Sequence, residues 1–528
     1  MKIKNHLLLA VMLSCLQAGA QTSSSAVISC SIGDLQPNDT IRLLVWDENL
    51  SEGSAHNLPY RTLTTVNNKG TLRFVIDDLK HPVYFSLVKE KEKTFGNWLS
   101  FISQYLLEPG DDLHIYMDSL RPAYTRFYGE TEDALTGYRV VGPRFTGKGA
   151  AKAEFTFLLD SNTNHWLQTA YTRKNHPHND LPGTKYDSAY FASYPATMEH
   201  VYEDNKAILD FQLTLLDRYR KNMSEEAYQV IRTNLIGSME SADVRFYSLF
   251  KPDPNDTLVS ADFKKHLGEQ LRSIYDNRQR ASISETPPSV LCLSKDYINF
   301  LTNYAFYLVP KGEEYAWLKE HYTSVFRDKL ITDFLMKWFF YLKDSQEVLS
   351  DAELVVQSEF SRHKVNDIYN GQSVGRPAYN FTLPSVSGEN RSLSDFRGKI
   401  VFIDLWYTGC GACSKFYRYQ LSRLEEKYKN DPNVVFITIS IDVDRQTWLK
   451  SVQSGYYTSA GLDNVVNLYT AGRGTEDPLI KAYNVTGYPH PFMIDRAGKI
   501  YRVNKLQAAA EDLIPVIDEA IAKNNAAK

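Results

Sequence analysis

Cysteine is scarce in this chain, with 5 in 528 residues. So few cysteines exclude a scaffold held together by disulfides, and the folded protein must therefore depend on hydrophobic cores. A chain of this length is too long for a single core, so we expect two to four domains.

The chain also lacks an excess of positive charge. Its formal net charge is −4 at pH 7, which implies no strongly basic face and argues against nucleic acid as the main partner. Beyond the N-terminus no apolar run reaches the eighteen residues typical of a membrane-spanning helix. We therefore expect a mature chain that is soluble and has no transmembrane span.

Residues 1–20 have the three parts of an export signal in the usual order. Lys2 and Lys4 provide a positive start, 7–16 an apolar stretch, and 18–20 a small-residue cleavage site. We interpret this segment as a cleaved signal peptide, the alternative being an N-terminal helix of the mature fold. The expected location is the periplasm or cell envelope.

The five cysteines differ in their surroundings. Cys15 lies in the signal segment, and its flanking residues form a poor lipobox, so we favour simple cleavage over lipidation. Cys30 and Cys292 lie in apolar segments and are predicted to be small buried residues, with a bridge between them as the alternative. Cys410 and Cys413 form the motif Cys-Gly-Ala-Cys.

Residues 26–149 carry short runs of β-forming residues separated by turn signals, which predict a small antiparallel β-sandwich-like domain. Strands are expected at 41–46, 72–76, 83–88 and 113–117.

Residues 150–365 have helical apolar periodicity and are predicted to form an all-α region whose aromatic stripe packs as core. Two helix starts are expected, at 224–226 and at 350–353, the second as a capping box. The tract His176-Pro177-His178 is the nearest approach to a metal site. We interpret it as a solvated loop, and no metal or cofactor is predicted.

Residues 370–377 are predicted to be a linker, and 374–528 alternate between strand and helix patterns. This alternation predicts an α/β layer structure with a partly parallel sheet. Strands are expected at 401–405, 434–441 and 491–494, and helices at 412–429, 446–452, 478–483 and 509–523.

The Cys-Gly-Ala-Cys motif follows the apolar run 400–406 and precedes a helical pattern, so Cys410 is predicted at a helix N-terminus. Unpaired N–H groups and the helix dipole favour a thiolate there. Zinc would need further ligands, and His490 is the one histidine of this region. A structural disulfide around so short a loop gives little stability. Redox exchange is the favoured use, and the other two stay open.

Residues 374–523 resemble the TlpA/ResA-type thioredoxin-like proteins, which are extracytoplasmic thiol–disulfide oxidoreductases. A β-rich part and a helical part before such a domain resemble an arrangement of Bacteroidetes-type envelope proteins. The motifs that carry the resemblance occur in the family's order: 377–384, 393–399, the cysteine pair, 485–489 and 492–499.

The resemblance implies a role for five residues. Cys410 is the attacking thiolate and Cys413 the resolving thiol. Pro489 is a cis proline facing the pair, and the backbone of Tyr488 pairs with a substrate segment. Asp404 is a buried acid that takes and returns the Cys413 proton. The alternative for Asp404 is a solvated or hydrogen-bonded acid at a strand end.

Four positions depart from the family pattern. Ala412 stands where reducing thioredoxins carry Pro, so the resemblance implies no particular redox potential. Gly409 stands where Trp is common, which leaves the nucleophile less shielded. Phe416 stands where members that serve cytochrome c maturation carry an acid. His490 stands where Thr is usual; we interpret it as a surface histidine, the alternative being one that titrates near neutral pH and stabilises the thiolate.

The sequence therefore predicts an exported reductase of protein disulfides that draws electrons from a membrane thiol donor, with the preceding domains recognising a partner. One alternative is a partner-binding envelope protein with a structural disulfide. The other is a peroxiredoxin-like peroxidase, which is disfavoured because Tyr407 replaces the threonine that such enzymes carry three residues before the cysteine.

Overall fold

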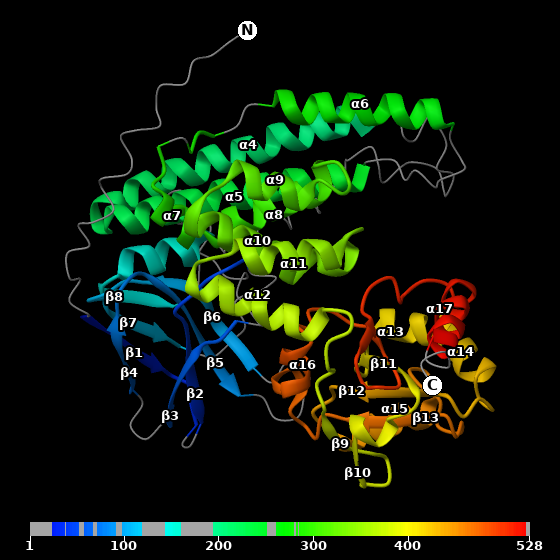
Figure 1. The fold of residues 1–528 in the computed structure, drawn as a ribbon. Coiled ribbons are helices and arrows are strands. Elements are labelled where there is room, and N and C mark those ends of the chain that lie inside the picture. The colour runs from blue at the N-terminus through cyan, green and yellow to red at the C-terminus, as the bar shows by residue number, and fades with distance from the viewer. Residues whose placement is uncertain are drawn as a thin grey trace, which may run out of the picture.

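The computed structural model describes residues 24–36, 39–51, 58–66, 71–90, 98–118, 143–159, 194–250, 260–278, 281–283 and 285–523. A sheet-rich part, a helical part and an α/β part follow one another along the chain, and in Figure 1 the helices lie above both of the others. The predicted signal peptide and the tract His176-Pro177-His178 lie outside the described residues.

The N-terminal part contains two four-stranded sheets, in the orders β4-β1-β7-β8 and β3-β2-β5-β6. Apolar side chains alternate along the strands, as in β4, where Leu72, Phe74 and Ile76 are buried, and they fill a core of this part. The strands are β1 Ser24–Ile32, β2 Thr40–Trp46, β3 Arg61–Val66, β4 Thr71–Leu79, β5 Val83–Glu90, β6 Trp98–Leu107, β7 Asp112–Met117 and β8 Arg144–Lys148.

The expectation of a purely antiparallel sandwich is wrong, because β1 and β7 pair in parallel. Parallel neighbours need a long connection, and here the chain forms β2 to β6, with β4 on the other side of β1, before β7 pairs with β1. Turn signals report only neighbouring strands, so they cannot reveal this pairing. Cys30 and Cys292 are both free thiols, so the bridge between them is not formed. Burial raises the pKa of Cys30 to about 12, as suits a core residue.

The helical part packs its helices around an aromatic-rich core. The predicted start at 224–226 is confirmed, since the Ala227 N–H donates to Ser224 Oγ at 2.9 Å. The predicted start at 350–353 is wrong, because the helix begins at Ser345. Leu349 and Ala352 are both buried on one face of this helix, so residues 350–353 lie within it. The helices are α4 Tyr194–Tyr219, α5 Glu225–Phe250, α6 Ala261–Asn277, α7 Pro288–Leu293, α8 Lys295–Leu308, α9 Glu314–His321, α10 Ser324–Trp338, α11 Ser345–Val355 and α12 Glu359–Gln372, with 3-10 turns at η3 Arg220–Asn222 and η4 Phe339–Tyr341.

The predicted linker at 370–377 is wrong over its first three residues, which belong to α12. Gln372 is buried, and its side-chain amide donates to the Tyr483 carbonyl of the α/β part. Gly371 lies so close to Ala482 that a Cβ would be 1.9 Å from its carbonyl oxygen. These contacts bring α12 beside α16 (Figure 1), so the helical part docks directly on the α/β part.

The C-terminal part has the thioredoxin-like fold, with a five-stranded sheet in the order β13-β12-β11-β14-β15. Strands β11 to β13 run parallel, whereas β14 pairs antiparallel with β11, and β15 pairs antiparallel with β14. The elements are β9 Thr382–Pro384, β10 Asn390–Ser392, η5 Leu393–Phe396, β11 Ile400–Trp406, α13 Gly411–Phe416, the π-helical turn η6 Tyr417–Leu421, α14 Ser422–Lys427, β12 Val434–Ser440, α15 Arg445–Ser454, β13 Val465–Tyr469, η7 Gly474–Glu476, α16 Pro478–Ala482, β14 His490–Ile494, β15 Ile500–Arg502 and α17 Ala510–Lys523.

Side chains of the central strand β11 alternate between two faces. Val401, Ile403 and Leu405 join the hydrophobic core that continues into the helical part. Phe402 faces the other way and packs with residues of α13, α14 and α17. The strand is buried throughout, so it holds the residues at its end in fixed positions.

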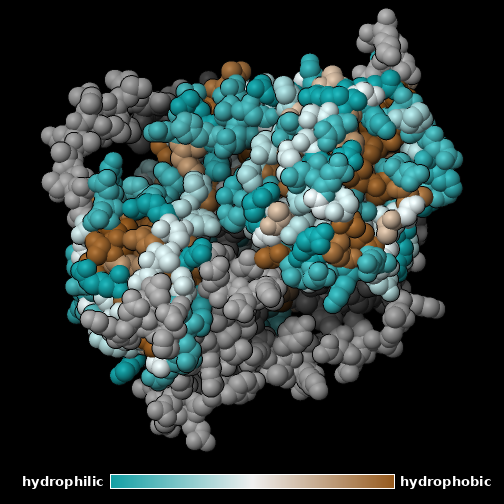
Figure 2. Space-filling view, turned by 90° about the horizontal axis from the view of Figure 1, so that it is seen from below, coloured by the Kyte–Doolittle hydropathy of each residue, from teal (hydrophilic) through white to brown (hydrophobic). Residues whose placement is uncertain are grey.

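The surface seen in Figure 2 is a mosaic of polar residues and separate apolar patches, several of them in the half of the view that holds the thioredoxin-like part. Among the residues that the structure describes, no helix combines the length and apolar character needed to cross a bilayer.

Candidate active site

The cysteine pair lies where β11 passes into α13. Cys410 is the N-cap of α13, and its Sγ accepts a hydrogen bond from the Cys413 N–H at 3.0 Å. The two cysteines form a disulfide with Cα atoms 5.2 Å apart. The predicted strand-to-helix setting is therefore confirmed. A sulfur in this position receives both a hydrogen bond and the positive end of the helix dipole, which together favour a thiolate after reduction.

The short loop before Cys410 is held by a buried carboxylate that sequence reasoning missed. Asp442 follows β12 and accepts three hydrogen bonds: from the Thr408 N–H at 3.0 Å, from the Thr408 hydroxyl at 2.7 Å and from the Ser440 hydroxyl at 2.8 Å. The Ser451 hydroxyl lies 2.7 Å from that of Thr408. Parallel strands end at the same edge of a sheet, so polar residues just after 406 and 440 were the available signal.

Gly409 takes a backbone conformation with φ +94°, and nothing lies within 4 Å of the place its Cβ would occupy. Its N–H donates to the Tyr457 hydroxyl at 2.9 Å, and the Tyr457 ring stacks on Trp406 with centroids 4.9 Å apart. No side chain of the described residues therefore covers the nucleophile at Gly409, as expected from a glycine at a position where Trp is common in the family. The hydrogen bond to Tyr457 holds the loop itself in place.

The strand that faces the cysteines begins after a cis peptide bond between Tyr488 and Pro489, as the resemblance implies. The Tyr488 carbonyl oxygen lies 3.9 Å from Cys410 Sγ. The Tyr488 ring meets the Tyr407 ring edge to face, with centroids 5.6 Å apart. The Pro489 carbonyl accepts a hydrogen bond from the Gln507 side chain at 2.8 Å. The structure thus brings Tyr488 and Pro489 against the cysteine pair.

His490 is neither a surface histidine nor one that titrates near neutral pH. Only 6% of it is exposed, and burial lowers its pKa to about 4. Its ring meets Phe340 of η4 edge to face at 4.8 Å. The helical part therefore covers the residue next to the cis proline, a contact between segments 150 residues apart in sequence that no local pattern could reveal.

Asp404 is buried, with 2% exposed, as the resemblance implies. Of the alternative, the solvated form is therefore wrong, whereas the hydrogen bonds of a strand-end acid are present. Burial raises its pKa well above the ordinary value, while hydrogen bonds from the backbone N–H groups of His490 and Leu405 act in the opposite direction. Sequence reasoning missed a second acid on this side of the sheet, Glu425, which is fully buried in α14.

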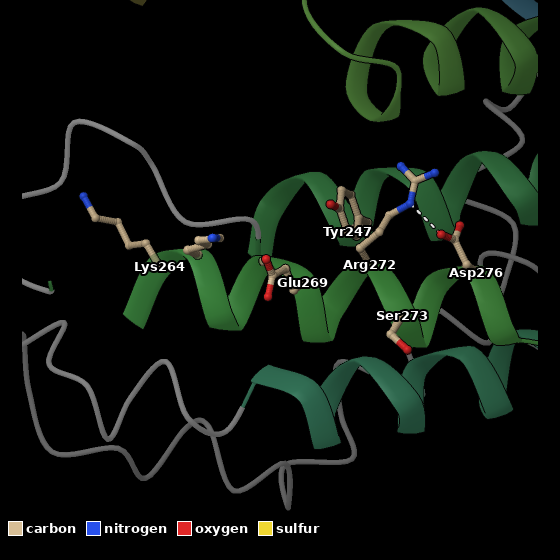
Figure 3. A pocket seen from close by; sticks show the side chains of 8 residues that line it. Tyr247, Lys264, Glu269, Arg272, Ser273 and Asp276 are labelled. Atoms are coloured by element: carbon tan, nitrogen blue, oxygen red, sulfur yellow. Dashed lines mark hydrogen bonds and ion pairs between the residues drawn. The ribbon is translucent and has the colours of Figure 1, made fainter. Parts of the chain in front are cut away.

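A pocket of about 560 Å³ lies elsewhere, between α5 and α6 (Figure 3), lined by Tyr247, Lys264, Glu269 and Arg272 among others. The Arg272 guanidinium donates to Asp276 at 2.7 Å. The pocket contains neither of the cysteines. Within the described ranges, no three His, Cys, Asp or Glu side chains are grouped as a metal site would require.

Comparison with known proteins finds relatives of the C-terminal part of the chain. Residues 373–521 match the Redoxin family. The thiol-disulfide oxidoreductase ResA of Bacillus thuringiensis subsp. konkukian (strain 97-27) is 30% identical over 146 residues, which cover 26% of this chain and 74% of that protein. ResA of Bacillus subtilis (strain 168) is 29% identical over 131 residues, covering 25% and 66%. A solved thioredoxin domain of a Bacteroides vulgatus thiol-disulfide oxidoreductase is 24% identical, with a TM-score of 0.25, and covers 28% of this chain and 98% of that one.

Proposed function

The chain belongs, through its C-terminal part, to the ResA-type thiol–disulfide oxidoreductases, and we propose that it is an exported reductase of protein disulfides that works through Cys410 and Cys413. One observation carries the proposal: Cys410 Sγ sits at the N-terminus of α13, bonded to the Cys413 N–H, and faces the cis Tyr488–Pro489 bond. This arrangement joins a stabilised thiolate to a backbone edge that a substrate can approach.

In the first step the Cys410 thiolate attacks one sulfur of a substrate disulfide. A new bond forms between Cys410 and that sulfur, and the other substrate sulfur leaves with the electron pair and takes a proton. The Cys413 N–H and the end of α13 stabilise the attacking thiolate. Gly409 leaves the side of Cys410 next to it free of a covering side chain, since nothing in the described part of the chain lies within 4 Å of the place its Cβ would occupy.

In the second step Cys413 resolves the mixed disulfide. Its thiol gives a proton to the buried Asp404, and the resulting thiolate attacks Cys410 Sγ. The bond between Cys410 and the substrate breaks, and the reduced substrate leaves with its electron pair. The enzyme is left with the disulfide seen in the structure. A thiol donor in the membrane would return the two electrons, because the compartment beyond the membrane holds no comparable source.

The substrate segment is proposed to lie along Tyr488 and Pro489. Proline has no N–H, so it leaves this edge of the strand unpaired, and an extended peptide can add to such an edge through main-chain hydrogen bonds. Phe340 and His490 pack behind the edge. The helical part therefore supports the back of the substrate site, in keeping with a role of the parts before 374 in recognising a partner.

A trapping experiment tests the function. The Cys413→Ser variant should accumulate mixed disulfides on Cys410, because it cannot resolve them, whereas Cys410→Ser should trap nothing. Both variants should carry Cys292→Ser, because Cys292 is a free, partly exposed thiol. The alternative, a binding protein with a structural disulfide, gains support if nothing is trapped and the wild type reduces no protein disulfide.

The reduction potential of the pair tests the direction of the reaction. We expect a value near ~−270 mV, as for a reductant; a value near ~−120 mV would make the protein an oxidant.

A further inference from the structure

Two buried carboxyl groups on the active-site side of the sheet have oxygens without hydrogen-bond partners. They are Oδ1 of Asp404 and both Oε atoms of Glu425. Asp404 is 2% exposed and Glu425 fully buried, and within the described part of the chain neither forms an ion pair with Lys, Arg or His. An ionised carboxylate in such a setting is strongly disfavoured, so a pair of them calls for a physical explanation.

The pleat of β11 places Asp404 beneath the helix that carries the cysteines. Its neighbours on the same face are Phe402 and Trp406, two positions away on either side. Phe402 packs in one core with Leu421 and Leu424, while Trp406 packs with Cys413. Asp404 therefore lies between the part of the helix that holds Leu424 and the part that holds Cys413.

The π-helical turn η6 Tyr417–Leu421 places Glu425 over the same region. Glu425 is twelve positions after Cys413, and a regular α-helix, at about 100° per residue, would turn it about 120° away. The extra residue of a π turn reduces this angle to about 20°, so Glu425 shares the face of Cys413. π turns occur frequently at functional sites.

The two acids interact, and they differ in which one keeps a proton. Burial and the neighbouring Asp404 raise the pKa of Glu425 to about 8. Asp404 receives backbone hydrogen bonds that favour its ionised form, whereas Glu425 has none. Tyr417 also interacts with Glu425, and its pKa is raised to about 12 by burial and by that acid. His490 turns its ring to Phe340. The hydrogen bonds to Asp404 and their absence at Glu425 favour Glu425 as the acid of the two that keeps a proton.

We infer that Asp404 and Glu425 form one carboxyl pair behind the cysteines, in which Glu425 is a positioning residue that retains a proton and leaves Asp404 free to accept the proton of Cys413. The part of this pair in resolving a mixed disulfide rests on the proposed function. During resolution the Cys413 proton moves to Asp404, the Cys413–Cys410 bond forms and the bond from Cys410 to the substrate breaks. The substrate thiolate carries away the electron pair, and Asp404 then releases its proton to water.

Two measurements that need no substrate test this pair. Infrared spectra of the oxidised protein at pH 7 should contain the carbonyl band of a buried protonated carboxyl, which Glu425→Gln removes and Glu426→Gln retains. Glu426 is the matched control because it is the adjacent, exposed acid. A band that survives in Glu425→Gln, or that Asp404→Asn removes, would overturn the assignment of the proton to Glu425.

The second measurement is the pKa of the Cys413 thiol in a Cys410→Ser background. It is obtained from the dependence of the alkylation rate on pH. Above about pH 8 an ionised Glu425 opposes the thiolate, so Glu425→Gln should lower the thiol pKa by about one unit, a tenfold gain in thiolate at a given pH. If Glu425→Gln does not fold, Glu425→Leu is of similar size and should give the same shift. An unchanged pKa in the folded variant overturns the coupling.

These readouts separate the inference from the proposed function. A wild type that shows both signatures but reduces no disulfide would refute the function and leave the carboxyl pair standing. A wild type that reduces disulfides without either signature would refute the pair alone.

Discussion

The buried acid Glu425 contributes to the pH dependence of the protein's stability, and a single substitution should remove that contribution. The folded state holds the Glu425 proton up to a pKa of about 8, whereas the unfolded chain releases it near the ordinary value of 4.5. Between these values the folded state binds more protons than the unfolded state, so the free energy of unfolding falls as pH rises. The contribution is fully present below about pH 4.5 and is lost by about pH 8.

The size of the effect follows from the shift. Each pKa unit corresponds to about 1.4 kcal/mol, so the wild type should lose about 3 to 5 kcal/mol through Glu425 across this window. The Glu425→Gln variant carries a neutral side chain of the same shape at every pH. Its stability should lie within about 1 kcal/mol of the wild type at pH 5, and exceed it by about 3 to 5 kcal/mol at about pH 8.5.

Urea unfolding, followed by tryptophan fluorescence at several pH values, measures this difference directly. The neighbouring Glu426→Gln should follow the wild-type curve, because Glu426 is exposed. If wild type and Glu425→Gln lose the same stability between about pH 5 and 8.5, Glu425 is already ionised in the folded state, and the reasoning from its burial is refuted.

Three further substitutions probe the contacts around the cysteines. Asp404→Asn should slow resolution of a mixed disulfide by about 10² at pH 7, as removal of a general base does, with a smaller deficit at high pH; an equal deficit at all pH values in single-turnover assays would contradict the proton transfer. Thr408→Val removes the hydroxyl bond to Asp442 and should lower the free energy of unfolding by about 1 to 2 kcal/mol, whereas unchanged urea curves would mean that this bond contributes nothing. Phe340→Ala should admit water to His490 and raise its pKa from about 4 toward 6.5, and an NMR titration that stays near 4 would show that other groups bury the ring.

Local sequence patterns were enough to predict the position of the cysteine pair and to favour redox exchange. The run 400–406 is apolar throughout, and a buried strand that leads into Cys-x-x-Cys and a helix places the first sulfur at the helix N-terminus whatever surrounds it. The alternation of strand and helix after residue 374 likewise predicted an α/β layer structure with a partly parallel sheet, because each element follows from its own periodicity. The thioredoxin-like fold itself was implied by the resemblance of 374–523 to the TlpA/ResA-type proteins.

The other expectations were wrong because they concern residues whose surroundings are set by contacts between distant segments of the chain. The parallel pairing of β1 with β7 joins strands separated by five others. The ring of the buried His490 meets Phe340, which comes from another part of the chain. Residues 370–372 have a linker-like composition, yet Gly371 fits because only a glycine can approach Ala482 so closely.

The sequence by itself determined the reacting atoms of this protein: two thiols, their spacing and their place at a helix end, all set by local geometry. Only the tertiary structure decided which groups surround them. In the sequence Glu425 is one of several charged residues of a helix. In the structure the π turn before it places Glu425 on the buried face. Asp442 meets Thr408 only because parallel strands end at one edge. A proton affinity depends on burial and neighbouring charge, and both are properties of the packed molecule rather than of any segment.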